Sequence, residues 1–344
     1  MRGEGWTRRN FLSSMAVAAA AERFRYDDPS TELSILRLTS PEHSSWLPAP
    51  ENRAISRRRA FLVFSSDRSG SPQAYQMFLS SGEFRQLSRA RDLDSSSVTL
   101  AADDRSVFYM DGPALVQLSL QSLKEREVYR VREGWSRAPG FSVSPDGSTA
   151  ALVETNSAVW QIRTVPLGGK AAGAATTAGE FRTAVTHPML RPGRGEVLYR
   201  EAGGGLGLAG RELPLAERPG GPVYWSPDGA NVMYLGGSAI REYTLETGAE
   251  RLVAKTSQFA SFSPNGDGSV FVGASASKAS PYVLLLLRVT RREMALCEHR
   301  ASDAARVAPV FSPDSQRVYF VSDRHGKPAI YTVSVERLVA KTGG

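Results

Sequence analysis

Histidine is the side chain of this sequence best suited to acid–base catalysis or to binding a transition metal, and the chain has four of them. An imidazole titrates near neutral pH, and several imidazoles or carboxylates together bind divalent cations. The four are spread along the chain without a metal-binding spacing: His43, His187, His299 and His325. Only His187, in Thr186-His187-Pro188 before a predicted strand, suggests a pocket residue, and a structural histidine bonded to a loop carbonyl is the alternative.

Several other kinds of chemistry are absent from the sequence. The single cysteine, Cys297, excludes an internal disulfide and a metal site built from thiolates. No Gly-x-Ser-x-Gly motif indicates a serine nucleophile. The glycine-rich stretch at 203–207 lacks the Lys-Ser/Thr pair of a phosphate-binding loop, so a flexible loop is expected there.

The charge balance is modestly basic. The formal net charge is +7, and residues 1–21 contribute three arginines against one glutamate, which leaves +5 for the remainder. A basic excess favours an acidic ligand such as a uronate or a phosphate, although a solvated surface rich in arginine has the same composition. No basic run with interleaved aromatic residues indicates a nucleic-acid partner.

The N-terminus has the pattern of an export signal. Paired arginines are followed by an apolar pair and a short alanine-rich stretch: Arg8 and Arg9, then Phe11 and Leu12, then residues 13–21. This order resembles a twin-arginine signal, with an incidental arginine pair before an alanine-rich helix as the alternative. We therefore expect residues 1–21 to be a leader and residues 22–344 to be periplasmic or secreted.

A second apolar run, Tyr282–Leu287, is six residues long and too short to cross a bilayer. A run of this length bounded by polar residues is typical of a buried strand. The sequence therefore predicts no membrane span.

Internal repeats determine the predicted architecture. Ser-Pro-Asp or Ser-Pro-Asn turns precede short β-rich runs, and together with degenerate copies the turns fall at positions 57, 102, 145, 192, 227, 264 and 313. Proline fixes φ for a turn, Asp or Asn bonds back to the backbone, and glycine takes the positive φ. Spacings of 35 to 49 residues match blades of four short strands. We therefore predict an all-β fold, a seven-bladed β-propeller with four-stranded antiparallel blades.

One early segment has no blade of its own. Residues 33–39, which include Ile35, resemble an outer strand, and we expect them to pair with the C-terminal blade and close the ring, which removes an exposed sheet edge. The segment Glu336–Thr342 repeats Glu250–Thr256 residue for residue and is the alternative candidate for that place.

These repeats resemble those of periplasmic propellers, a group that includes TolB-like proteins. Several other segments of the sequence resemble oligogalacturonate lyases. The segments are Asp28–Thr31, Ile35–Pro41, Phe61–Phe64, Ser66–Arg68, Leu87, Leu123–Trp135, Thr186–Pro192 and Ser322–Tyr331. The lyase family cleaves short pectin fragments by β-elimination. The resemblance implies a histidine base, an arginine, and a manganese ion held by histidines and a glutamine.

The sequence departs from that pattern at the expected histidines. Pro222 stands at the place of the base. Arg306 and Ala308 stand at the two histidine positions of the family's His-Pro-His metal motif, and Asp303 stands at the position of the glutamine ligand. The remaining metal histidine is expected near residues 258–260, which contain no histidine. The resemblance therefore predicts no manganese and no other cofactor, and no lyase activity by the family's mechanism.

Arginine can replace a metal as the group that neutralises a carboxylate. Arg306 is a candidate for this role, and Arg211 aligns with the family's catalytic arginine. Arg306, Arg211 and His187 are the predicted ligand-binding residues, and Arg211 and His187 are also the candidate catalytic residues.

Two functions remain open from the sequence. The first is a diverged relative of the oligogalacturonate lyases that binds or acts on acidic oligosaccharides at the propeller's central mouth. The second is a TolB-like, non-catalytic propeller that binds a periplasmic protein. An arginine-lined central pocket favours the sugar, and a flat or apolar face favours the protein.

Overall fold

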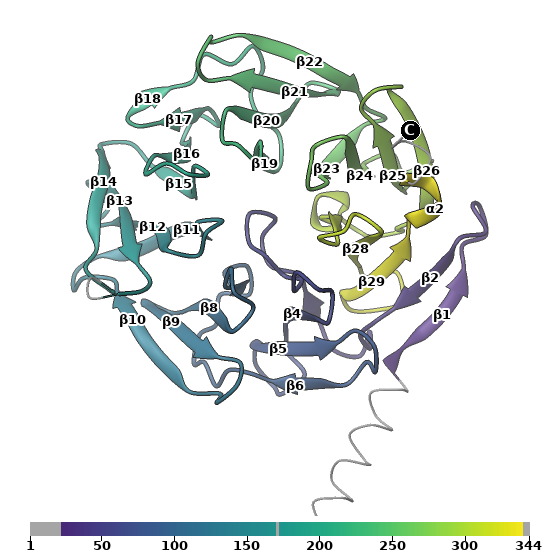
Figure 1. The fold of residues 1–344 in the computed structure, drawn as a ribbon, viewed down its shortest axis with the longest axis horizontal. Helices are drawn as coiled ribbons and strands as arrows, with labels where there is room; N and C mark the ends of the chain where they lie inside the picture. Colours follow the sequence, from purple (N-terminus) through teal and green to yellow (C-terminus); the bar gives the residue numbers. More distant parts are fainter. Residues whose placement is uncertain (1–21, 170–171, 340–344) are drawn as a thin grey trace, which may run out of the picture.

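The structure is a computed structural model that describes residues 22–169 and 172–339. Seven antiparallel sheets stand around a central axis and form a closed ring (Figure 1). The predicted seven-bladed β-propeller is confirmed. The predicted export signal at 1–21 lies outside the described residues.

Each of the first three blades contains four strands, numbered from the centre of the ring outward in chain order. Blade 1 contains β3 (Ser45–Trp46), β4 (Phe61–Ser66), β5 (Gln73–Phe78) and β6 (Phe84–Gln86). Blade 2 contains β7 (Thr99–Leu100), β8 (Ser106–Asp111), β9 (Ala114–Ser119) and β10 (Glu125–Arg130). Blade 3 contains β11 (Ser136–Val143), β12 (Thr149–Thr155), β13 (Trp160–Pro166) and β14 (Thr176–Phe181).

The next three blades repeat this order. Blade 4 contains β15 (Val185–Leu190), β16 (Val197–Glu201), β17 (Leu206–Leu208) and β18 (Arg211–Glu212). Blade 5 contains β19 (Val223–Trp225), β20 (Asn231–Gly236), β21 (Ala239–Thr244) and β22 (Glu250–Lys255). Blade 6 contains β23 (Phe259–Pro264), β24 (Val270–Ser275), β25 (Tyr282–Leu287) and β26 (Arg292–Glu298).

Blade 7 joins the two ends of the chain. Its inner strands are β27 (Val310–Phe311), β28 (Arg317–Ser322) and β29 (Ala329–Ser334), and its outer strands are β2 (Ser34–Arg37) and β1 (Phe24–Asp27). Ile35 of β2 is opposite Val333 of β29, which is the pairing expected from the sequence. Blade 7 thus has five strands where four were expected, because β1 and β2 form a hairpin that adds one strand at the rim.

The alternative closing segment does not join the sheet in its described part. Residues Glu336–Val339 form the short helix α2 after β29, and a helix η1 (Ala304–Arg306) of the 3₁₀ type precedes β27. No helix among residues 22–169 and 172–339 combines the length and the apolar character needed to cross a membrane.

The recurring turn joins the first and second strands of a blade. In blade 5, Ser226 Oγ donates to Asp228 Oδ1 at 2.5 Å and accepts from the backbone N–H of Asn231 at 2.8 Å. Gly229 supplies the positive φ of 69° that the turn needs. The same serine-to-aspartate bond recurs in blades 3 and 7, so the sequence repeat corresponds to a repeated set of local hydrogen bonds.

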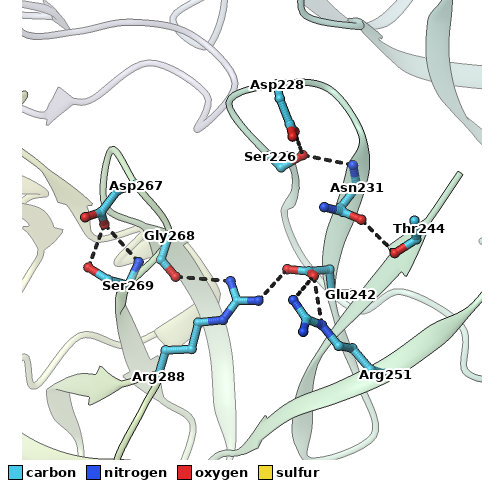
Figure 2. Close-up of polar contacts among 10 residues, drawn as sticks. All are labelled: Ser226, Asp228, Asn231, Glu242, Thr244, Arg251, Asp267, Gly268, Ser269 and Arg288. Atoms are coloured by element: carbon cyan, nitrogen blue, oxygen red, sulfur yellow. Dashed lines mark hydrogen bonds and ion pairs between the residues drawn. The ribbon is translucent and has the colours of Figure 1, made fainter. Parts of the chain in front are cut away.

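Charged contacts reinforce the packing between neighbouring blades. Glu242 of β21 in blade 5 is only 3% exposed and accepts bonds from Arg251 of the adjacent strand and from Arg288 (Figure 2). Arg288 belongs to blade 6 and also donates to the carbonyl of Gly268 at 3.2 Å. One guanidinium therefore joins two blades through a buried carboxylate.

Candidate binding site in the centre of the ring

A loop of blade 1 reaches into the middle of the ring. The segment between β3 and β4 appears as the purple loop at the centre of Figure 1. Its tip is a β-turn in which the N–H of Asn52 donates to the carbonyl of Ala49 at 2.8 Å, with Pro50 and Glu51 between them. Proline at the second position of a turn is favoured because its φ is already fixed.

The side chain of Asn52 anchors this turn to two other blades. Its Nδ2 donates to the carbonyl of Ser96, which precedes β7, at 3.1 Å. The same Nδ2 donates to the carbonyl of Phe141 in β11 at 3.0 Å. The turn is therefore held in place at the axis, and Glu51 lies at its tip.

Three adjoining cavities surround this turn. The first, of about 340 Å³, is lined by Glu51, His187, Arg200 and Pro222 among others. The second, of about 400 Å³, shares Glu51 and His187 with the first and adds the side chain of Arg137. The third, of about 480 Å³, is lined on one side by Trp46, Asp303, Arg306 and Ala308. The ring thus holds a divided central pocket with an arginine in each part.

Arg200 is the arginine of these cavities whose charge has no carboxylate partner. It lies near the end of β16 and donates to the carbonyls of Pro219, at 3.3 Å, and Gly221. It forms no ion pair with any residue of the described chain. Burial lowers the pKa of Arg200, which the charge of Glu51 partly offsets, and the guanidinium remains charged at neutral pH.

The other two arginines are paired. Arg137 Nη2 lies 2.6 Å from Asp94 Oδ2, and Arg306 Nε lies 3.5 Å from Asp303 Oδ2. Arg137 still has a buried Nη1 without an acceptor among the residues that the structure describes. An anionic ligand in the first cavity would pair the charge of Arg200.

His187 is held in an unfavourable backbone conformation. It lies in β15 with a φ of 49° and precedes Pro188, although a residue before proline prefers extended backbone. Gly140 of β11 packs directly on it, since a Cβ at Gly140 would lie 2.3 Å from the His187 Cα. Such local strain is often found at functional sites.

His187 lines the first two cavities and is exposed to solvent. Its Nδ1 and the Thr186 Oγ1 share a hydrogen bond of 3.0 Å, and its Nε2 has no bonding partner within the described chain. Burial and the nearby Arg200 charge lower the pKa of His187, so the imidazole is neutral at neutral pH.

Glu51 is the carboxyl group that lines both the first and the second cavity, and Asp94 also lines the second. The Glu51 side chain forms no hydrogen bond or ion pair with another side chain of residues 22–169 and 172–339. Burial raises the pKa of Glu51, and the charge of Arg200 opposes this only in part. The site therefore contains a neutral imidazole, a carboxyl group whose pKa is raised, and a guanidinium without an ion-pair partner in the described chain.

The structure separates the residues that the sequence grouped as ligand-binding. His187 lines the first two cavities, and Arg306 is 84% exposed at the edge of the third. Arg211 lies in β18, the outermost strand of blade 4, with its side chain exposed to solvent. Its alignment with a catalytic arginine crosses a glycine-rich stretch, and its position at the rim removes it from the central pocket.

The residues at the expected metal positions do not fit a manganese ion. Among the described residues, no three His, Cys, Asp or Glu side chains are grouped so that they could hold a metal. Arg306 and Ala308 line the third cavity, where the only carboxylates are Asp303 and Asp323, and a guanidinium repels a cation.

The remaining histidines have structural partners or lie outside the cavities. The buried His299 bonds the Ser275 carbonyl through Nε2 at 2.9 Å, and His325 Nδ1 bonds the Tyr331 hydroxyl at 2.8 Å. His43 lines none of the three cavities.

Sequence analysis missed Arg200 and Glu51. Both carry a weak local signal, because Arg200 follows the buried run Val197–Tyr199 and Glu51 follows the turn-forming Pro48-Ala49-Pro50. Neither signal shows that the two side chains lie in one cavity.

Comparisons with known proteins agree with the resemblance. No family model matches the chain. The oligogalacturonate lyase of Dickeya dadantii (strain 3937) is 21% identical over 376 residues, covering 90% of this chain and 95% of that protein. The oligogalacturonide lyase of Pectobacterium atrosepticum is 21% identical over 378 residues with the same coverage.

Solved structures give the same result for the fold. An oligogalacturonate lyase in complex with manganese superposes with a TM-score of 0.81 at 22% identity, covering 91% of this chain and 96% of that one. The oligogalacturonate lyase of Vibrio parahaemolyticus superposes with a TM-score of 0.82 at 21% identity and the same coverage. TolB from Acinetobacter baumannii reaches only 0.45, which is too weak to bear on function. In sequence and in fold, over about nine tenths of its length, this chain is similar to oligogalacturonate lyases.

Proposed function

We propose that this propeller binds acidic oligosaccharides, of the uronate class, in the cavities at the centre of its ring and without a metal ion. The observation that carries the proposal is Arg200, a partly buried guanidinium that faces a cavity and has no carboxylate partner in the described chain. A planar guanidinium binds a carboxylate through two parallel hydrogen bonds, which suits the acid group of a uronate.

The similarity to proteins named oligogalacturonate lyases supports this choice of ligand. The lining of the cavities supports it as well, since polar groups and short apolar segments both face the ligand space, as in sites for small molecules. No structural observation favours the protein-binding alternative, which becomes an outcome of the test.

The test is calorimetric titration of the purified protein with digalacturonate, in the presence of a chelator and again with added manganese. We expect binding that does not depend on metal, together with a raised melting temperature in the presence of the sugar. A neutral disaccharide of the same length should bind far more weakly.

Two variants locate the site. Arg200→Gln should weaken digalacturonate binding about 10- to 150-fold, since a hydrogen bond to a charged group contributes about 1.5–3 kcal/mol. Arg211→Gln removes an arginine from the outer rim and should leave binding unchanged. If digalacturonate and the neutral sugar bind equally, or neither binds, the proposal is wrong and a protein partner becomes the better hypothesis.

We also propose that the protein is exported through the twin-arginine route to the periplasm or the cell exterior. The support is the sequence pattern at Arg8, Arg9, Phe11 and Leu12. Replacing both arginines by lysine should retain the protein inside the cell, as measured by immunoblotting of cell fractions. Unchanged export of the variant would contradict this route.

A further inference from the structure

A fourth cavity lies between blades 3 and 4, outside the central pocket. Its volume is about 450 Å³, and it is lined by the turn between β11 and β12 and by the turn between β15 and β16. Arg200, near the end of β16, lines the central pocket, whereas this cavity adjoins the turn that precedes β16. We call it the interblade cavity, and it shares no lining residue with the three central cavities.

The interblade cavity occupies a place where a contact between neighbouring turns is missing. A Cβ at Gly147 of blade 3 would lie 2.9 Å from the Ala102 Cβ in the turn of blade 2. A Cβ at Gly229 of blade 5 would lie 2.9 Å from the Pro192 carbonyl oxygen in the turn of blade 4. The corresponding glycine of blade 4, Gly193, has no atom of the described residues within 4 Å of its Cβ position. The turns of blades 3 and 4 therefore stand apart, although the turns on either side pack closely.

Hydroxyl groups form much of the polar lining. Thr164 of β13 and Thr176 of β14 share one hydrogen bond of 2.9 Å between their Oγ1 atoms. That bond uses only one of the two hydroxyl protons, so the other hydroxyl can still donate to a ligand. The cavity is lined by five hydroxyl side chains, which are Ser144, Ser148, Thr149, Thr164 and Thr176.

The charges in the lining balance one another. Asp146 Oδ1 accepts three bonds within its own turn, whereas Oδ2 accepts only the Ser148 hydroxyl at 3.0 Å and keeps a free lone pair. Hydrogen bonds from this turn lower the pKa of Asp146, so the group is ionised at neutral pH. Arg194 lines the same cavity and forms no ion pair with a residue that the structure describes. The other arginine, Arg191, is paired with Glu196 at 2.5 Å.

We propose that the interblade cavity binds a neutral sugar unit. A sugar hydroxyl both donates and accepts, so it can donate to the free lone pair of Asp146 and exchange bonds with the threonine pair. The apolar face of the sugar ring has matching surface in Pro145, Pro166 and Leu190. The volume lies in the range of small-molecule sites, and the balanced charge offers no excess cation for a phosphate or a uronate. The inference does not depend on the proposed function, because the two sites share no residue.

The test is an NMR titration of the full protein with methyl galactoside and methyl glucoside, two neutral sugars, accompanied by saturation-transfer measurements. We expect at least one of them to bind with a dissociation constant of about 1–10 mM, because a ligand of this size makes few contacts. This affinity agrees with the weak binding of a neutral disaccharide expected in the test of the central pocket.

Gly195→Leu fills the cavity with little strain on the fold. Gly195 lines the cavity, its φ is not positive, and no atom of the described residues lies within 4 Å of its Cβ position. The leucine side chain should weaken sugar binding by at least about 10-fold, because it takes the space of the ligand. Gly266→Leu is the matched control, since Gly266 also has an open Cβ position, lies in the corresponding turn of blade 6, and lines none of the four cavities.

Asp146→Asn tests the carboxylate. It should weaken sugar binding by about 10-fold or more, since a hydrogen bond to a charged group is lost. Asp228→Asn is its control, because Asp228 accepts the same serine bond in the turn of blade 5 and lines none of the four cavities. Circular dichroism and thermal unfolding verify that each variant is folded.

The results separate this site from the central pocket. Sugar binding that Gly195→Leu and Asp146→Asn weaken, and that both controls and Arg200→Gln retain, supports the inference, whatever the result with digalacturonate. Absence of binding by both sugars overturns it. Equal binding in all variants, an equal loss in Asp146→Asn and Asp228→Asn, or a loss in Arg200→Gln alone places the sugar elsewhere and also overturns it.

Discussion

Gly140→Ala tests whether the packing of two blades positions His187. A Cβ at Gly140 would lie 2.3 Å from the Cα and 2.6 Å from the backbone nitrogen of His187. These are backbone atoms, which cannot rotate away, so one of the two strands must move. The φ of Gly140 is +97°, a region that side chains other than hydrogen disfavour.

Two contributions determine the expected loss of stability. Forcing a non-glycine residue into a left-handed conformation costs about 1–2 kcal/mol, and overpacking a close contact costs about 1–3 kcal/mol. The free energy of unfolding should therefore fall by about 2–5 kcal/mol in Gly140→Ala.

Gly134→Ala is the matched control. Gly134 has a φ of +75° and no atom within 4 Å of the position of its Cβ, so the substitution adds backbone strain without a clash. Urea unfolding should show a loss of about 1–2 kcal/mol in this control, with sugar binding unchanged. Equal losses of stability in the two variants, or a crystal structure of Gly140→Ala with an unmoved His187, would refute the proposed positioning.

Two further predictions concern stability. Arg288→Ala should lower the free energy of unfolding by about 1–3 kcal/mol in urea titrations, because a nearly buried carboxylate loses one of its two guanidinium partners, while Arg306→Ala should change it by less than about 0.5 kcal/mol. An Arg288 variant as stable as the Arg306 variant would show that the contact between blades adds nothing. His299 must be neutral in the folded protein, because its Nδ1 accepts a backbone N–H, and burial lowers its pKa. The unfolded chain therefore takes up the proton first as pH falls below about 6.5, and stability should decline between about pH 6.5 and the lower folded pKa. His299→Gln should show a smaller decline in urea unfolding over this range, and an unchanged decline would contradict the assignment.

Local chemistry explains why the propeller was predictable. The turn of Ser226 and Asp228 is closed by bonds that span at most five residues, so its sequence pattern is readable without knowledge of the tertiary fold. The unpaired apolar strand around Ile35 also pointed to closure with the last blade. The extra strand β1 was not expected, because its short sequence Phe24–Asp27 carries no repeat and pairs only with its own hairpin partner.

The candidate site was predictable only in part. His187 was predictable as a pocket residue because it precedes Pro188 and a predicted strand. The absence of the family's histidines was predictable because the resemblance assigns histidine to particular positions of the sequence. Arg211 was grouped with His187 because it aligns with the family's catalytic arginine, and that alignment is loose across the preceding glycines. Arg211 lies in β18, the outermost strand of blade 4, and this position places it at the rim.

The sequence by itself determined the repeated turns, the number of blades, the basic charge and the residues at the expected metal positions, because each depends on residue type and short-range spacing. Only the tertiary structure decided that Glu51, His187 and Arg200 share one cavity. The reason is geometric: closing a ring turns the inner end of every blade toward one axis, so residues far apart in the chain meet there. Their pKa values and the free charge of Arg200 follow from that enclosure and not from the residues alone.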